Sequence, residues 1–227
     1  MPGRFRVTCK KWFWYTYDYL GTLIVVNVLW ILCALPVITL PVSMAGLFHV
    51  TTRIAAMQET GIRDFFTGVR LYTWRSVRLC IVYAVCLTLL AVNLLFYARM
   101  IEQWSWVAAV LVGGLFWLMV FVLVTGLMTF PLLMASNDPV KLVIRKGVLL
   151  VIDNMGEIAM LFIGFLTVLL IGAATGAGLI FGAVSVAGML CSTGLRELQK
   201  KYVDTVDEDP EEVRGWRDLF RPWDYGK

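Results

Sequence analysis

Four long stretches of this sequence contain no aspartate, glutamate, lysine or arginine, and they limit the possible folds more than any other feature. They lie between Asp18 and Arg53, Arg78 and Arg99, Glu102 and Asp138, and Glu157 and Arg196. A bilayer core about 30 Å thick is crossed by about 20 apolar residues in a helix, and each stretch is at least that long. The chain is therefore predicted to be an integral membrane protein.

The composition agrees with this prediction. The chain is 59% apolar and 16% charged, whereas soluble domains are about 45–50% apolar and about 25% charged. A soluble globule, a disordered chain, a disulfide scaffold and a nucleic-acid-binding domain are excluded as descriptions of the whole chain.

The first and fourth stretches are too long for one span, and each contains residues that break a helix. Pro36 and Pro41 interrupt the first stretch, because proline disfavours a helix at the preceding residue and donates no backbone hydrogen bond. Three glycines in 172–178 interrupt the fourth stretch and predict a turn. The predicted membrane segments are Leu20–Leu35, Val42–Met57, the second stretch as one span, a long tilted helix over Trp106–Leu133, Gly156–Ile171 and Leu179–Leu195.

The positions of lysine and arginine test whether the chain turns back after Pro36. If residues 42–57 cross or re-enter the membrane, 19 of the 20 basic residues lie on one side, and only Arg99 lies on the other. Positive charge is normally kept on the cytoplasmic side. We therefore expect an all-α, polytopic helical bundle of five to six membrane segments in three hairpins, with both termini cytoplasmic. A full span and a re-entrant helix both remain open for residues 42–57.

This topology divides the chain into three parts. Residues 1–19 form a basic and aromatic cytoplasmic segment, residues 20–195 the transmembrane helical domain, and residues 196–227 an acidic and aromatic cytoplasmic tail. The tail contains Trp216 and Trp223 among arginines, and we expect it to pack on the protein's own inner face, on the membrane surface or on another chain.

Two further segments are predicted to be amphipathic helices that lie on the cytoplasmic surface, 62–78 and 139–152. Asp138 followed by Pro139 is a good start for the second helix. Both segments suit anionic lipid, and a docking platform for a cytoplasmic partner is the alternative. The candidate partner or lipid surface consists of Arg63, Arg70, Lys141, Arg145, Trp216 and Trp223.

Few polar side chains fall inside the membrane segments, where such groups are costly and often functional. The candidates for a ligand or ion pathway are Asn27, His49, Arg53 and Asn93. Gly46, His49 and Arg53 share one helical face because they are three and four residues apart. Arg53 could bind an anion, pair with Asp64 or extend to the headgroups, while a lone histidine is more often a packing residue than a ligand.

Several site types are absent from the sequence. A single histidine cannot form a His-based metal site, and the five cysteines show no C-x-x-C spacing. No phosphate-binding loop or hydrolase motif is present. We expect no enzyme activity, no cofactor, no metal and no nucleic-acid partner.

One region resembles a known family. Asn27-Val28-Leu29-Trp30, Leu35-Pro36-Val37-Ile38-Thr39, Ala45-Gly46-Leu47-Phe48, and Asp64-Phe65-Phe66 with Arg70 resemble the YesL-like bacterial membrane proteins, which contain a domain of unknown function. The resemblance covers about residues 15–80. It implies a multi-pass protein of the bacterial plasma membrane and an accessory role in carbohydrate uptake, and it implies no catalytic residues.

Three functions compete at this stage. The leading expectation is a non-enzymatic accessory or scaffold subunit that contacts the lipid bilayer and another membrane or cytoplasmic subunit. The alternative is a small transporter or permease component with a site near His49 and Arg53. A membrane enzyme acting on a lipid-linked substrate would need an acid–base set that the sequence does not contain.

Overall fold

The structure is a computed structural model that describes the backbone of residues 2–202 and the side chains of residues 5–100 and 106–202. This part of the chain is helical and contains no strand, which confirms the all-α prediction. Its elements are α1 (Pro2–Asp18), α2 (Leu20–Ala34), the 3-10 turn η1 (Val37–Thr39), α3 (Leu40–Ala55), α4 (Ile62–Arg99), α5 (Ile101–Ala135), α6 (Val140–Asp153), α7 (Met155–Ala174), α8 (Ala177–Phe181) and α9 (Ala183–Gln199).

Several helices can cross a membrane. Four of those described are long and apolar enough: Val37–Ala55, Ile62–Arg99, Trp106–Ala135 and Met155–Ala174. A fifth is added if α1 and α2, which meet at 83°, form one broken span. The chain is therefore a helical membrane protein with four or five candidate spans, where five to six membrane segments were predicted.

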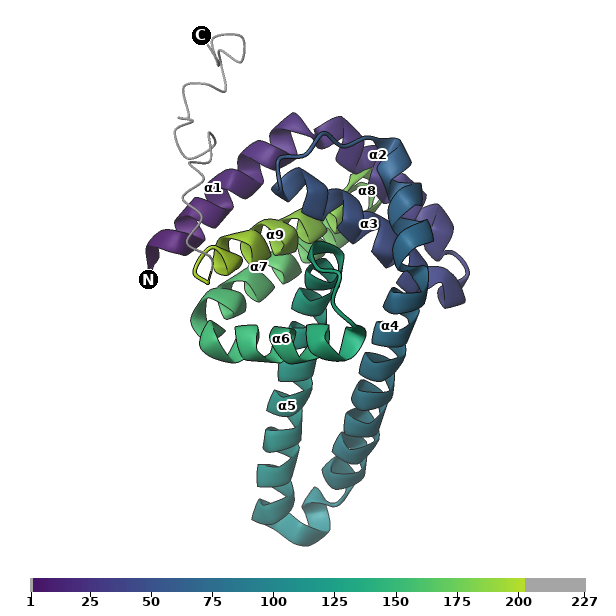
Figure 1. Ribbon diagram of the computed structural model, residues 1–227. Helices are drawn as coiled ribbons and strands as arrows, with labels where there is room; N and C mark the ends of the chain where they lie inside the picture. The colour runs from purple at the N-terminus through teal and green to yellow at the C-terminus, as the bar shows by residue number, and fades with distance from the viewer. Residues whose placement is uncertain (1, 203–227) are drawn as a thin grey trace.

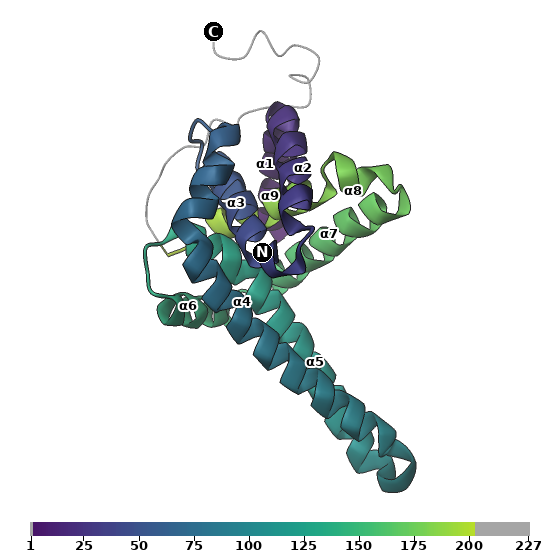
Figure 2. The same ribbon diagram turned by 90° about the vertical axis from the view of Figure 1, so that its right-hand side faces the viewer.

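The molecule has a compact body and a two-helix arm (Figures 1 and 2). We define the arm as residues 80–99 of α4 and 101–123 of α5. Ala108 is the one buried residue among the arm side chains that the structure describes. The other helices pack around the opposite ends of α4 and α5, so the arm extends beyond the body without a third helix beside it.

The helix α4 corrects the prediction for residues 62–78. These residues form no separate surface helix, because α4 runs without a break for 38 residues. At 1.5 Å per residue the helix is about 57 Å long, nearly twice the thickness of a bilayer core. The charge-rich beginning of α4 therefore belongs to the body, and its charge-free remainder forms half of the arm.

The centre of the body is formed by α9 and α3. Twelve residues of α9 are buried, several of them small. A β-carbon added to Gly188 would lie 2.7 Å from Leu47 Cδ2 of α3, and one added to Gly194 would lie 2.5 Å from Leu161 Cδ1 of α7. Small residues allow this close approach of helices. Most of the predicted membrane segment Leu179–Leu195 thus belongs to α9, the interior helix of the body.

The predicted hairpin turns are present, with one correction. The chain turns between α2 and α3 at Pro36–Pro41, and it turns after α7 in the predicted glycine-rich region. The single segment predicted over Leu179–Leu195 is wrong, because the chain breaks again at Gly182, where φ is 145°. This φ lies in a region that side-chain-bearing residues rarely adopt.

The start of α6 differs from the prediction. Pro139 occupies the N-cap position and Asp138 does not cap the helix. The Asp138 carboxylate instead forms an ion pair with Lys146, two turns further along the helix.

The N-terminal helix α1 contacts α9 near both of its ends. Lys11 Nζ lies 2.9 Å from the Glu197 carboxylate, and the Trp12 indole donates a hydrogen bond of 2.9 Å to the carbonyl of Val186. Trp14 and Tyr15 of the predicted basic and aromatic segment are buried in the body.

Candidate functional site

The structure separates the four candidate pathway residues. His49 and Arg53 lie together on the face of α3 that packs on α4. Asn27 lies on α2 and faces α8 and α9. Asn93 lies on the arm, is exposed, and donates a hydrogen bond of 2.8 Å to the carbonyl of Leu89 in its own helix. No single pathway contains all four residues.

The contact between α3 and α4 is reciprocal. Phe65 of α4 fills the space above Gly46 of α3, where an added β-carbon would lie 2.7 Å from its ring. His49 of α3 fills the space above Gly68 of α4, where an added β-carbon would overlap the His49 side chain. The predicted face of Gly46, His49 and Arg53 is therefore a helix–helix contact.

His49 is half-buried in this contact. Its ring lies 5.5 Å from the ring of Tyr72, measured between centroids. Its Nε2 atom is shielded from solvent and has no hydrogen-bond partner among the described residues. The imidazole therefore retains one nitrogen able to exchange a proton or to contact a polar group.

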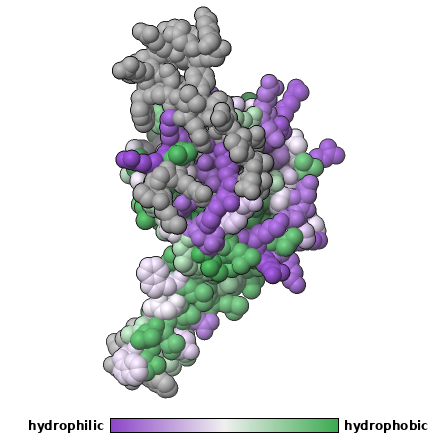
Figure 3. Space-filling view, turned by 60° about the vertical axis from the view of Figure 1, so that its left-hand side comes forward, coloured by the Kyte–Doolittle hydropathy of each residue, from purple (hydrophilic) through white to green (hydrophobic). Residues whose placement is uncertain are grey.

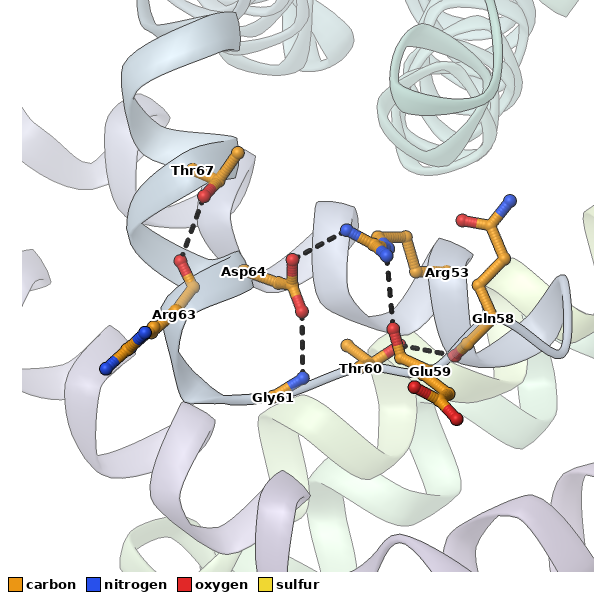
Figure 4. Close-up of polar contacts among 8 residues, drawn as sticks. All are labelled: Arg53, Gln58, Glu59, Thr60, Gly61, Arg63, Asp64 and Thr67. Atoms are coloured by element: carbon orange, nitrogen blue, oxygen red, sulfur yellow. Dashed lines mark hydrogen bonds and ion pairs between the residues drawn. The ribbon is translucent and has the colours of Figure 1, made fainter.

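Arg53 is engaged with the connection between α3 and α4 (Figure 4). Its Nη1 atom lies 2.6 Å from the Asp64 carboxylate, and its Nη2 atom donates a hydrogen bond of 3.1 Å to the carbonyl of Glu59. Asp64 also accepts a hydrogen bond of 2.8 Å from the Gly61 amide, which caps the start of α4. Of the roles predicted for Arg53, the structure shows the pairing with Asp64.

The same connection contains an unusual backbone conformation. Met57 has a φ of 56°, a left-handed value that is uncommon for a residue other than glycine. The Arg53–Asp64 pair spans this turn from both sides. The pair therefore holds a short, strained link between two packed helices.

Asn27 joins α2 to the second broken hairpin. It is fully buried, and its Nδ2 atom donates to the carbonyls of Leu179 at 2.7 Å and Ile180 at 2.9 Å. Its Oδ1 atom accepts a hydrogen bond of 3.2 Å from the amide of Ser185. One amide thus satisfies backbone groups on both sides of the Gly182 break, which is a structural role.

Sequence reasoning missed a polar cluster on the opposite end of α9. Glu197 pairs with Lys11, which is almost completely buried, and with Lys200 at 3.2 Å. Arg196 donates a hydrogen bond to the carbonyl of Ala55 at the end of α3. One sequence feature pointed here: Glu197 and Arg196 are the first charged residues after a charge-free stretch of 38 residues.

The candidate surface residues are also distributed over the fold. Arg63 and Arg70 are exposed on α4, and Lys141 and Arg145 are exposed on α6. Trp216 and Trp223 lie outside the described residues. Among the side chains of residues 5–100 and 106–202, no group of three potential metal ligands comes together.

Two cavities adjoin these helices. One, of about 470 Å³, has almost entirely apolar walls from α3, α4, α5, α7 and α9 at the base of the arm. Its wall includes the hydroxyl of Tyr83, which lies 2.8 Å from the hydroxyl of Thr129. The other is a groove of about 770 Å³ beside α6.

Comparison with known proteins finds one family model that is similar to part of the chain. Residues 23–94 match the family described as "Protein of unknown function, DUF624". The matched region begins in α2 and ends in the arm portion of α4, so it contains the Gly46–Phe65 and His49–Gly68 contacts. No curated protein and no solved structure matches the chain.

Proposed function

We propose that this chain is a non-enzymatic accessory subunit of a membrane complex in the bacterial plasma membrane, with both termini in the cytoplasm. The observation that carries the proposal is the arm. The two apolar helices of the arm extend beyond the body, so they provide a surface for the transmembrane helices of another subunit. The orientation rests on the lysine and arginine distribution.

The composition of the arm supports this role. On α4, exposed apolar residues recur at helical spacing along one face, namely Val82, Val85, Leu89 and Val92. On α5, Val110 and Trp117 are about 70% exposed. Within this proposal, these faces pack against helices of the partner, since helix association in a membrane rests on van der Waals packing. The arm therefore offers both helices of a hairpin to a partner.

The link to carbohydrate uptake is a narrower part of the proposal. It rests on the YesL-like resemblance of residues 15–80. Within this proposal, the partner is a membrane subunit of a sugar-import system.

Site-specific photocrosslinking tests the accessory role. A photoreactive phenylalanine analogue placed at Leu89 in the native host is expected to give one discrete protein adduct of a membrane subunit. The matched control is Ile163, an equally exposed apolar position on α7 of the body, which is expected to give only lipid adducts. Lipid adducts alone from Leu89 and from Val85 would contradict the proposal.

The unpartnered Nε2 atom of His49 favours a second candidate, a transporter component with a site between α3 and α4. In this case His49→Ala and Arg53→Ala, measured in proteoliposomes, are expected to lower substrate uptake by about tenfold or more, as when a buried polar contact is lost. Asn93→Ala serves as a control because Asn93 bonds only its own helix. Uptake unchanged in both variants would remove this candidate.

A further inference from the structure

The helix α6 presents an exposed stripe that is half cationic and half apolar. Lys141, Arg145, Leu149 and Ile152 are spaced four, four and three residues apart, so they follow one face of the helix. All four side chains are exposed, and Leu149 and Ile152 are more than half exposed. An amphiphilic ligand could pair with the two cations and also cover the exposed aliphatic side chains, which are unfavourable in water.

The two cations are not neutralised by the acidic residues around them. Asp138 pairs with Lys146, and Asp153 pairs with Lys201 at 2.6 Å. Hydrogen bonds from Lys201 and then Tyr202 hold the pKa of Asp153 below its usual value, so this carboxylate stays ionised and engaged. Within residues 5–100 and 106–202, no acidic side chain forms an ion pair with Lys141 or Arg145. They are therefore available to an external anion.

An apolar groove continues from the aliphatic half of the stripe. It has a volume of about 770 Å³ and is lined by the apolar Leu132, Leu149, Leu150 and Ile152 and by the polar Lys146, Asp153, Gln199 and Tyr202. Leu149 and Ile152 belong to both the stripe and the groove. A ligand with an anionic head and a hydrocarbon chain could contact both features at once.

The position of α6 fits the level of lipid headgroups. Figures 1 and 2 show α6 lying crosswise at the base of the arm. Arg75 of α4 donates to the carbonyls of Ser136 and Asp138, which places another cation beside the start of α6. On the face shown in Figure 3, hydrophilic side chains gather on the body, and hydrophobic ones cover the beginning of the arm. The stripe therefore lies near the boundary between polar and apolar surface.

We propose that α6 and its groove form a binding site for one anionic phospholipid. The phosphate lies against Lys141 and Arg145, and an acyl chain follows Leu149 and Ile152 into the groove. The charge of the two unpaired cations selects an anionic headgroup, and the apolar groove selects a lipid over a soluble anion. This site is independent of the arm and of any partner subunit.

Photolabelling of the full chain in nanodiscs tests the site. The discs contain phosphatidylcholine and a small fraction of phosphatidylglycerol with a diazirine in its acyl chain. Labelling is expected to concentrate on peptides that line the groove and to be competed by unlabelled phosphatidylglycerol. Equal competition by phosphatidylcholine would overturn the proposal, since it would show contact with bulk lipid only.

Paired variants separate this site from general attraction to anionic lipid. Lys141→Gln with Arg145→Gln is expected to raise the phosphatidylglycerol fraction at half-maximal labelling by about thirty-fold, because two cations that contact the phosphate are lost and each contributes about fivefold to binding an anionic lipid. Arg63→Gln with Arg70→Gln removes the same charge from α4 and is expected to leave groove labelling unchanged. Leu149→Ser with Ile152→Ser is expected to reduce groove labelling while the protein remains folded, because both side chains are exposed.

Three results would overturn the assignment. The first is undiminished labelling in the Lys141 and Arg145 variant, and the second is an equal loss in the α4 control. The third is absence of groove labelling in the parent chain together with strong labelling after the acidic residues of 204–212 are neutralised, since the chain's own segment would then be the occupant.

Discussion

Replacing Gly68 by alanine is expected to destabilise the protein by about 2–3 kcal/mol, the upper range for overpacking a close helix contact. The added β-carbon would overlap His49, whose own backbone is held in α3, so the two helices would have to separate. Separation would also withdraw Phe65 from the space above Gly46. The midpoint of unfolding in a titration of dodecylmaltoside micelles with dodecyl sulfate measures the change.

Two matched variants make the Gly68 result specific. Gly113→Ala on the arm has nothing within 4 Å of its added β-carbon and is expected to leave the midpoint unchanged or raise it slightly. Adding His49→Gly to Gly68→Ala removes the overlapping atoms, so it is expected to recover the loss except for about 1 kcal/mol, the usual cost of glycine in a helix. A double variant no more stable than Gly68→Ala would show that His49 is not the obstacle.

Replacing Asn27 by leucine is expected to cost about 3 kcal/mol, because three backbone groups lose a hydrogen-bond partner at a cost of about 1 kcal/mol each. The carbonyls of Leu179 and Ile180 and the amide of Ser185 would lose the buried Asn27 amide as their partner. Leucine has a similar size, so the loss reports the hydrogen bonds more than the packing.

Asn93→Leu is the control for Asn27→Leu, since Asn93 is exposed and bonds only the carbonyl of Leu89. Its free energy of unfolding should stay within about 0.5 kcal/mol of that of the parent chain, as for surface substitutions. Proteolysis at the Gly182 break provides a second readout, because loosening there should appear in the Asn27 variant alone. Equal losses in the two asparagine variants would contradict the bridging role of Asn27.

These variants concern the residues that sequence reasoning placed in a ligand or ion pathway. The Asn27 amide and the Nη1 and Nη2 atoms of Arg53 are engaged by backbone and carboxylate groups of the same chain. His49 combines a packing role with one free nitrogen. Polar residues in membrane segments can thus serve assembly, because an unsatisfied backbone group is costly away from water.

Local features of the sequence predicted the two hairpin turns, and they included the pairing of Arg53 with Asp64 among three possible roles for Arg53. Arg53 and Asp64 are eleven residues apart and flank a short connection, so few alternative partners compete. The contacts of Asn27 could not be predicted in the same way, because Ser185 is 158 positions away. The pairing of Lys11 with Glu197 could not be predicted for the same reason, because the two residues are 186 positions apart.

The sequence by itself determined the membrane class, the helical architecture and the turns at Pro36–Pro41 and 172–178. Charge-free length, proline and glycine act locally, so they can be interpreted without knowledge of neighbouring helices. Only the tertiary structure decided that α9 lies inside the body while the arm of α4 and α5 stands outside it. Both regions are apolar, and apolar residues pack equally well against lipid and against another helix. The choice between these environments depends on the close approach at residues such as Gly188 and Gly194, which exists only once the helices are in contact.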